Sequence, residues 1–216
     1  MKRSVSTIGG LLLASALLAA CGSSKSASTT TSEAAAGIQK DAAAAALVPE
    51  AIAKKGTLTV AADASYPPDE FMDADGKTVI GMDVDLMNAI GDVLGLKVTV
   101  SNAAFDTIIP ALVSGKFDVG ASSFTDTKER EQQVDFVTYF SAGEGFYINA
   151  DSKNSFDGLD SLCGYKVAVE KGTVEETDAT TQDATCKAAG KPGVTVLSFG
   201  TQNEANLALI NVFFYG

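Results

Sequence analysis

Hydroxyl side chains and one arginine gather in a single short segment, Ser122-Ser-Phe-Thr-Asp-Thr-Lys-Glu-Arg130. A strand-like run precedes it, so its hydroxyls and backbone N–H groups are expected at the carboxyl end of a strand. An arginine fork binds a carboxylate through two parallel charge-assisted hydrogen bonds, and N–H groups at a helix start add donors. The segment therefore favours an anion site centred on Arg130. A capped surface helix with a solvated Arg130 explains the same spacing.

Acidic residues occupy the loop after the first predicted strand. Asp63, Asp69 and Glu70 would draw cations to this loop, which hints at a polar or cationic ligand. A generally acidic surface accounts for them equally well, because the 216-residue chain has a formal net charge of −11. That charge, without a basic run, disfavours nucleic acid as a partner.

Nucleophilic and metal chemistry have few carriers in this sequence. It contains no histidine, which is the commonest general base and zinc ligand, and three cysteines. Metal sites and cysteine–histidine nucleophiles are therefore not expected, and no cofactor is implied. Glu170 and Glu175 are candidates for the placed acid that an acid-catalysed reaction would need, and neither has an evident activating partner. We predict that the chain is not an enzyme.

Alternating strand and helix patterns must position these residues. Short links join the elements, an arrangement typical of a parallel sheet covered by helices, in which ligands bind at the carboxyl ends of strands. We expect Gly95 to end the first helix and Asp106 to cap the second. The predicted order is strand 57–62, helix 82–94, strand 96–100, helix 106–115 and strand 117–121.

A second α/β unit follows a stretch rich in β-branched and aromatic residues. This stretch, residues 134–147, is expected to cross in extended form from one lobe to another. Beyond it the pattern predicts strand 165–170, helix 174–189, strand 194–199 and helix 203–210.

The amino-terminal residues are typical of an export signal. Lys2 and Arg3 precede an apolar run that ends at Ala20 and is too short to span a bilayer comfortably. An uncleaved membrane anchor is the alternative. Beyond it, residues 21–55 begin with a Ser-, Thr- and Ala-rich composition that predicts a flexible tether.

Two cysteines, Cys163 and Cys186, lie well beyond the export signal, whereas Cys21 directly follows it. In an exported chain such a pair is expected to form a disulfide, which would contribute roughly 3 kcal/mol by closing its loop. Two free buried thiols are the alternative.

Four stretches, in order, resemble the periplasmic amino-acid-binding proteins of polar amino-acid ABC importers, solute-binding protein family 3. The resemblance covers roughly residues 56–210 and implies a two-lobed α/β periplasmic-binding-protein fold of type II. It implies lobe 1 over residues 56–143 and a partial lobe 2 over residues 144–216, with the ligand enclosed between them. The stretches read ADASYPPDEFMDADGK, GMDVDLMNAIGDVLGLKV, FDTIIPALVSGKFDVGASSFTDTKEREQQVDFVTYF and LCGYKVAVEKGT.

The export signal also resembles that of a known class. Its ending, Leu18-Ala-Ala-Cys21, is similar to the lipobox of bacterial lipoproteins. The resemblance implies a signal peptide over residues 1–20, lipidation of Cys21, and an extracytoplasmic protein anchored to the cell membrane by its lipid.

Matched motif by motif, the resemblance implies which residues bind the ligand's α-carboxylate. Arg130 would bind it directly. The hydroxyl of Thr125, the backbone of Ser123 and the glycine turn that includes Thr173 would add further donors.

The same matching implies the surroundings of the ligand's side chain. Tyr66 and Phe105 would sandwich the ligand, and Asp63 would face its side chain. Core packing of the two aromatics and a loop-cap role for Asp63 are the alternatives. Asp69 and Glu170 depart from the family, which usually has an aromatic or amide residue at the first position and often a basic or small residue at the second.

The resemblance implies that the protein captures a free amino acid for an ABC permease in the membrane. A dehydratase-type enzyme on the same fold and a sensor or adhesion lipoprotein are alternatives. In the family, the stretch matching NEANLALI is followed by another strand and by an Asp that binds the α-ammonium, whereas residues 211–216 follow it here. We therefore expect a truncated chain with an incomplete second lobe, and a fragment that does not bind is a further alternative.

Overall fold

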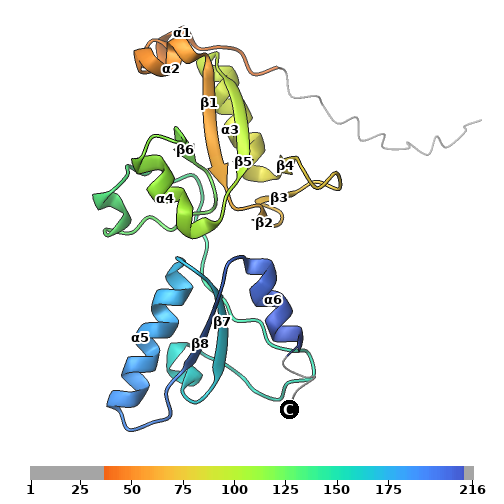
Figure 1. Cartoon of the computed structure of the whole chain (residues 1–216), viewed down its shortest axis with the longest axis vertical. Coiled ribbons are helices and arrows are strands. Elements are labelled where there is room, and N and C mark those ends of the chain that lie inside the picture. The colour runs from red at the N-terminus through yellow and green to blue at the C-terminus, as the bar shows by residue number, and fades with distance from the viewer. Residues whose placement is uncertain (1–36, 212–216) are drawn as a thin grey trace, which may run out of the picture. The chain divides into compact units, whose positions relative to one another are not determined.

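A three-stranded parallel sheet forms the centre of the first α/β unit (Figure 1). The computed structural model describes residues 37–211. In it β1 (Thr57–Ala62) pairs in parallel with β5 (Lys97–Asn102) on one side and with β6 (Val119–Gly120) on the other. The predicted parallel strands are therefore confirmed, and their carboxyl ends meet at one edge of the sheet.

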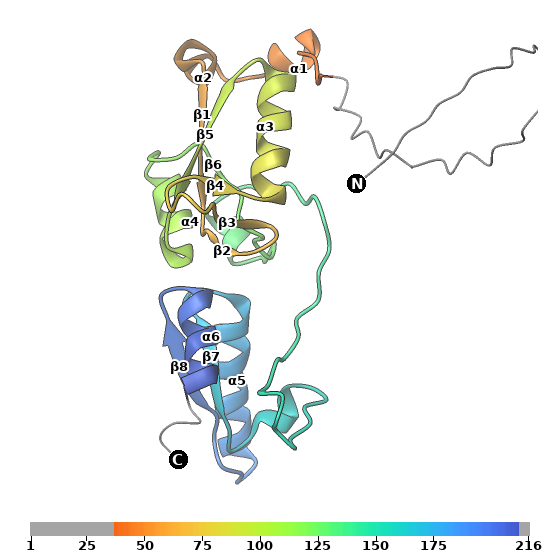
Figure 2. The ribbon, with the colours of Figure 1, turned by 90° about the vertical axis from the view of Figure 1, so that its right-hand side faces the viewer.

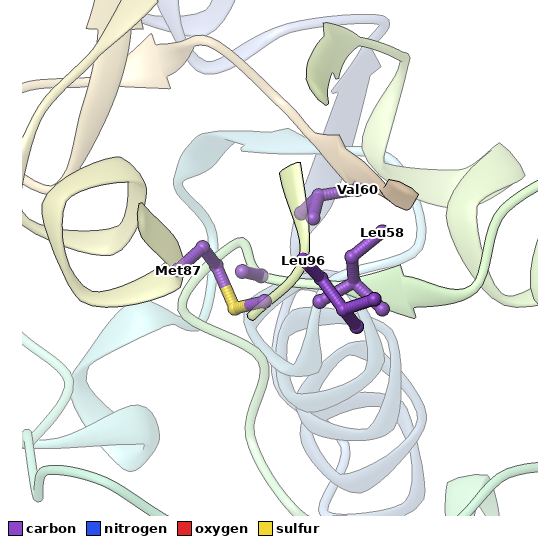
Figure 3. Packing of buried hydrophobic residues seen from close by; sticks show 5 residues of the cluster. Leu58, Val60, Met87 and Leu96 are labelled. Carbon is purple, nitrogen blue, oxygen red and sulfur yellow. The ribbon is translucent and has the colours of Figure 1, made fainter. Parts of the chain in front are cut away.

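The core of this unit lies where α3 (Met82–Leu94) packs on the sheet. Val60 of β1 is fully buried and belongs to one apolar cluster with Met87 and Leu96 (Figure 3). The helix ends, as predicted, at Gly95, whose φ of 70° lies in the left-handed region that glycine favours. Burial of this cluster fixes β1 and hence the loop that follows it.

The second helix corrects one sequence expectation. The predicted N-cap role of Asp106 is wrong, because α4 (Phe105–Val113) begins one residue earlier, after Ala104. Asp106 lies in the first turn instead and forms an ion pair with Lys171 at 2.7 Å. A carboxylate in the first turn still interacts favourably with the helix dipole.

A small antiparallel sheet follows β1 and was not expected from the sequence. It contains β2 (Ser65–Tyr66), β3 (Glu70–Met72) and β4 (Val79–Ile80) in that order. Strands of two or three residues are too short to show an alternating pattern, which explains why they were not predicted. They matter because they hold Tyr66 and Glu70.

The amino-terminal part of the described chain is folded. The flexible tether expected over residues 21–55 is therefore not what the structure shows for its later part, where α1 (Ala42–Ala45) and α2 (Glu50–Lys55) form. Asp41 caps α1, and its backbone N–H donates to the carbonyl oxygen of Val93 at 2.9 Å. Alanine has the highest helix propensity, so the Ala-rich run that looks like a linker also forms a helix once it has a capping residue.

The remaining amino-terminal predictions lie outside the described residues. These are the signal peptide over residues 1–20, the lipidation site Cys21 and the first part of the tether. Between residues 37 and 211 no helix is both long and apolar enough to cross a membrane.

The second α/β unit follows the predicted crossing stretch. Residues 134–147 contain neither helix nor strand. Beyond the short 3₁₀ helix η2 (Leu159–Leu162), two strands pair in parallel and two helices pack against them (Figure 2). All four elements lie within one residue of their predicted bounds: β7 (Lys166–Glu170), α5 (Val174–Ala188), β8 (Thr195–Phe199) and α6 (Gln202–Asn211).

The predicted disulfide is present in this unit. Cys163 and Cys186 are joined, with their Cα atoms 5.6 Å apart. Cys186 is buried in an apolar cluster with Leu162 and Val194, so the bridge ties α5 to the segment that precedes β7. The alternative of two free thiols does not hold.

Candidate ligand-binding site

Arg130 is a buried cation that begins the short 3₁₀ helix η1 (Arg130–Gln132), ten residues after the end of β6. Its Nη1 donates to the carbonyl oxygen of Thr125 at 2.7 Å, and its Nη2 donates to the carbonyl oxygen of Gly172 at 2.9 Å. Its Cζ lies 5.5 Å from the ring centre of Phe105 and 5.3 Å from that of Phe124, within cation–π range. Only 9% of the residue is exposed, and burial lowers the pKa of the guanidinium. Arg130 is therefore not the solvated surface residue of the alternative interpretation.

Hydrogen bonds to neighbouring backbone and carboxyl groups hold the turn that precedes Arg130. The Ser122 hydroxyl accepts from the backbone N–H of Asp63 at 2.8 Å and donates to Glu70 Oε1 at 2.9 Å. Ser123 has a φ of 49°, a left-handed conformation that non-glycine residues rarely adopt, and its N–H donates to Asp83 Oδ2 at 3.2 Å. Thr125 is exposed, and it is its carbonyl that contacts Arg130.

Glu70 and Asp83 form a buried carboxyl pair beneath this turn. They are 0% and 1% exposed. Burial, with the charge of Asp83 adding to it, raises the pKa of Glu70 to about 9, so Glu70 keeps its proton at neutral pH. Tyr139, in the crossing stretch, donates its hydroxyl to Asp83 Oδ2 at 2.6 Å. The pair thus connects the turn to the segment that leads into the second unit.

Asp63 follows β1 and is 2% exposed. Its Oδ1 accepts from the Ser65 hydroxyl at 2.6 Å, and its Oδ2 accepts from the backbone N–H of Phe105 at 3.0 Å. The second bond satisfies an N–H at the start of α4 that has no partner within the helix. Both carboxylate oxygens therefore have protein donors, as the loop-cap alternative expects.

Tyr66 and Glu170 meet through their side chains. The Tyr66 hydroxyl donates to Glu170 Oε2. Glu170 is the last residue of β7 and is 1% exposed, and its Oε1 has no hydrogen-bond partner among the described residues. Burial raises the pKa of Glu170 to about 8; the hydrogen bond from Tyr66 opposes this shift, and the charge of Asp63 adds to it.

Thr173 and the glycine turn form the start of α5. The Thr173 hydroxyl accepts from the N–H of Glu176 at 3.2 Å and donates to the carbonyl oxygen of Glu170 at 2.8 Å. Gly172 has a φ of 82°, and its N–H donates to Glu176 Oε2 at 2.7 Å. The side chain of Thr173 is thus an N-cap, and the turn also presents the carbonyl that Arg130 contacts.

The structure places several of the predicted site residues in two groups. In the first, Arg130 lies beside the ring of Phe105, whose backbone N–H donates a hydrogen bond to Asp63. In the second, the hydroxyl of Tyr66 donates to Glu170. Sequence reasoning missed Phe124, whose ring stacks on that of Phe105 at 4.3 Å. Its aromatic type, in the middle of a hydroxyl-rich segment, was the available signal.

A hollow of about 440 Å³ lies beside Tyr66 and Glu170, between β7, α6 and the stretch 144–148. Arg130 does not line it, so the site around Arg130 is defined by its contacts and not by this hollow. In the part of the chain that the structure describes, no group of three or more His, Cys, Asp or Glu residues is arranged to hold a metal ion.

The sequence matches the family described as bacterial extracellular solute-binding proteins, family 3, over residues 58–214. The chain belongs to this family. The α/β periplasmic-binding-protein fold of type II, predicted from the resemblance, is therefore confirmed.

Individual relatives are amino-acid-binding proteins. The arginine-binding protein ArgT of Corynebacterium glutamicum is 40% identical over 166 residues, which cover 76% of this chain and 54% of ArgT. An ancestral arginine-binding protein bound to arginine has a TM-score of 0.65 and 39% identity, covering 73% of this chain and 67% of its own. An ancestral amino acid-binding protein, a precursor of cyclohexadienyl dehydratase, has a TM-score of 0.66 and 34% identity, covering 74% and 68%. The chain spans about half the length of the curated relatives it matches.

Proposed function

We propose that this protein captures a free amino acid outside the cytoplasm and presents it to an ABC permease. Family membership and the names of its relatives support this function. The observation that carries it is Arg130, a buried cation that lies beside two stacked aromatic rings and donates to two backbone carbonyl oxygens. A binding protein for a free α-carboxylate needs such a group, whereas a scaffold does not.

In this proposal the guanidinium binds the α-carboxylate of the ligand. The carbonyl oxygens of Thr125 and Gly172 now accept its N–H donors. A carboxylate would accept from the same fork with charge assistance, which makes the exchange favourable. Ser123 would turn its backbone N–H, which now donates to Asp83 Oδ2, toward the carboxylate, and Thr173 would position the glycine turn as the two lobes close on the ligand.

Tyr66, Phe105 and Asp63 surround the side chain of the ligand in the same proposal. The Phe105 ring already stacks on Phe124, so it would offer its other face. Asp63 is bonded to the first residue of α4, which fixes its carboxylate and limits the entropy lost on binding. The relatives' names make arginine the first ligand to test.

The lipid anchor is a separate part of the proposal. A signal peptide over residues 1–20 and lipidation of Cys21 would hold the protein at the outer face of the cell membrane. A Cys21→Ala variant expressed in a bacterium that processes lipoproteins should lose acylation, seen as the mass difference of the mature protein. It should also leave the membrane fraction, and unchanged fractionation would contradict the anchor.

A dehydratase-type enzyme is the second candidate. One observation favours it: Glu170 is a buried acid with a pKa raised to about 8, in a chain similar to a precursor of a dehydratase. Incubation with a cyclohexadienyl amino acid distinguishes the two, because a binding protein gives no product. We expect none.

Calorimetric titration of the protein with each of the twenty amino acids tests the main proposal. We expect Arg130→Ala to weaken binding by about 30-fold or more, because removing one member of a desolvated charge pair costs roughly 2–5 kcal/mol. Lys128→Ala is the matched control, since it removes a cation from the same segment at an exposed position. Equal affinity for an amino acid and its α-amide would contradict the role of the carboxylate.

A further inference from the structure

We infer that Glu170 accepts a cationic nitrogen group of the ligand and so sets specificity for ligands that carry one. This inference rests on the proposed function, because it adds a second recognition point to the same site. The group is a guanidinium or an ammonium. Either the side chain of a basic amino acid or its α-ammonium could supply it.

The partners of Glu170 leave one of its oxygens free within the described residues. Oε2 accepts from the hydroxyl of Tyr66, a residue already predicted to contact the ligand. Oε1 has no donor, although the residue is 1% exposed and its side chain is among the most deeply buried large ones. A carboxylate oxygen removed from water without a donor is costly, so the position is stable only if a proton or a cation satisfies it.

The surroundings select a cation over an anion. Asp63 lies close enough to add to the pKa shift of Glu170, and both of its own oxygens already accept from protein donors. The nearest basic residue along the chain, Lys171, is paired with Asp106 at 2.7 Å. The hollow beside Glu170 is lined mostly by apolar and aromatic residues, and its charged members are four acids and one exposed lysine, namely Glu144, Glu170, Glu175, Asp178 and Lys166.

A proton on Glu170 and a bound cation would exclude each other. With its pKa at about 8, Glu170 holds a proton at neutral pH, which can satisfy the free oxygen or the contact with Asp63. A cation would displace this proton. The groups that face Glu170 are the Tyr66 hydroxyl, the carboxylate of Asp63 and the backbone of Gln202, and none of these brings a positive charge. Cation binding at pH 7 should therefore release a proton.

Two variants with the same change in net charge test the inference. Glu170→Gln removes the buried carboxylate, and Glu50→Gln removes an exposed one on α2 that does not line the hollow. We expect Glu170→Gln to weaken arginine binding by about tenfold or more, the range of a hydrogen bond to a charged group, and Glu50→Gln to change it by less than about twofold. Equal affinities of the wild type and Glu170→Gln would overturn the inference.

Three ligand analogues identify the source of the cation. Citrulline has the shape of arginine without its side-chain charge, and Nα-acetylarginine lacks the α-ammonium. If Glu170→Gln weakens arginine and Nα-acetylarginine but spares citrulline, the guanidinium is the partner. If it weakens arginine and citrulline but spares Nα-acetylarginine, the α-ammonium is the partner. Agmatine keeps the guanidinium and the amine but has no carboxylate, so it does not need Arg130.

Agmatine also separates failure of the inference from failure of the proposed function. Agmatine binding that depends on Glu170, in a protein that binds no amino acid, would support the inference and contradict the function. If Arg130→Ala abolishes arginine binding and Glu170→Gln leaves it unchanged, the proposed function is supported and the inference is contradicted. If the protein binds neither arginine nor agmatine, both are overturned. Proton release on the unmodified protein is an independent check. Titrations of arginine in two buffers of different ionisation enthalpy should give different heats for the unmodified protein at pH 7 and the same heat for Glu170→Gln.

Discussion

Two buried glutamates, one in each α/β unit, differ in how their oxygens are satisfied. Glu70 is 0% exposed, and its oxygens accept from Ser122 at 2.9 Å and from Ser123 at 3.3 Å, while its proton can bridge to Asp83. Glu170 is 1% exposed, yet one of its oxygens has no donor in the described part of the chain. Both have raised pKa values for the same reason, burial, so the pKa alone does not separate them.

The difference indicates two roles for the same residue type. A buried carboxyl group whose partners all belong to the protein rigidifies the structure around it, and here it supports the turn before Arg130. A buried carboxyl group with an oxygen that lacks a hydrogen-bond donor destabilises the fold but can accept a hydrogen bond from a ligand. Substitution at the first position should therefore affect stability, and substitution at the second should affect ligand choice.

The largest effect on stability is expected from Asp83→Ala. This change removes the acceptor of both the Tyr139 hydroxyl and the Ser123 N–H, and the partner of the Glu70 proton. Buried polar groups without partners should lower the free energy of unfolding by roughly 3–5 kcal/mol, measured by urea denaturation. Asp85→Ala, on the exposed side of the same helix, is the control. A loss below about 1 kcal/mol would mean that the pair does not support this unit.

Reduction of the disulfide should have the next largest effect, on the unit that holds Glu170. The bridge closes a loop with a sequence separation of 23 residues, for which the chain-entropy model gives roughly 3 kcal/mol. Unfolding in the presence and absence of a reducing agent measures it. The Cys163→Ala and Cys186→Ala double variant should match the reduced protein and should no longer respond to reductant.

The pH dependence of stability should distinguish the two glutamates. Both have a higher pKa in the folded protein than the ordinary value of 4.5, so the folded state binds a proton that the unfolded state has released. Stability should therefore fall as pH rises from about 4.5, up to about pH 8 for Glu170 and about pH 9 for Glu70, because each group holds one proton that unfolding releases. Glu70→Gln and Glu170→Gln should each remove the contribution of one proton from the slope of the free energy of unfolding against pH.

Saturating arginine sharpens this experiment. If a cation displaces the proton of Glu170, ligand should remove the contribution of Glu170 to the slope and leave that of Glu70 in place. The Glu170→Gln protein should then show the same slope with and without arginine. An equal effect of ligand on both variants would mean that the two carboxyl groups do not have separate roles.

Much of the fold was predictable from the sequence, because its longer elements carry strong patterns. β1, α3, β7 and α5 follow from β-branched runs, helical spacing and glycine stops. The small sheet that holds Glu70 was not predictable, because its strands have only two or three residues. The fold of α1 was hidden for a different reason, since alanine-rich sequence is common to linkers and to helices.

At the candidate site, the position of Arg130 was indicated by the sequence. An arginine after a hydroxyl-rich segment favours an anion site, although the same spacing also fits a solvated surface arginine. The free oxygen of Glu170 was not predictable, because it depends on which side chains three-dimensional packing brings near. The sequence marked Glu170 as a candidate acid and as a departure from its family, and burial with a missing donor gives that departure a physical meaning.

The smallest effect is expected at Thr173, a residue with an expected role both in stability and in ligand binding. Its hydroxyl caps α5 and bonds to the carbonyl of Glu170, so Thr173→Ala should lower the free energy of unfolding by about 1 kcal/mol, the usual value of an N-cap. Thr173→Ser keeps the hydroxyl and should restore it, while Thr177→Ala tests an exposed threonine of the same helix. If Thr173 only positions the turn, Thr173→Ser should bind arginine with wild-type affinity. A loss of affinity in Thr173→Ser without a loss of stability would instead place the methyl group of Thr173 against the ligand.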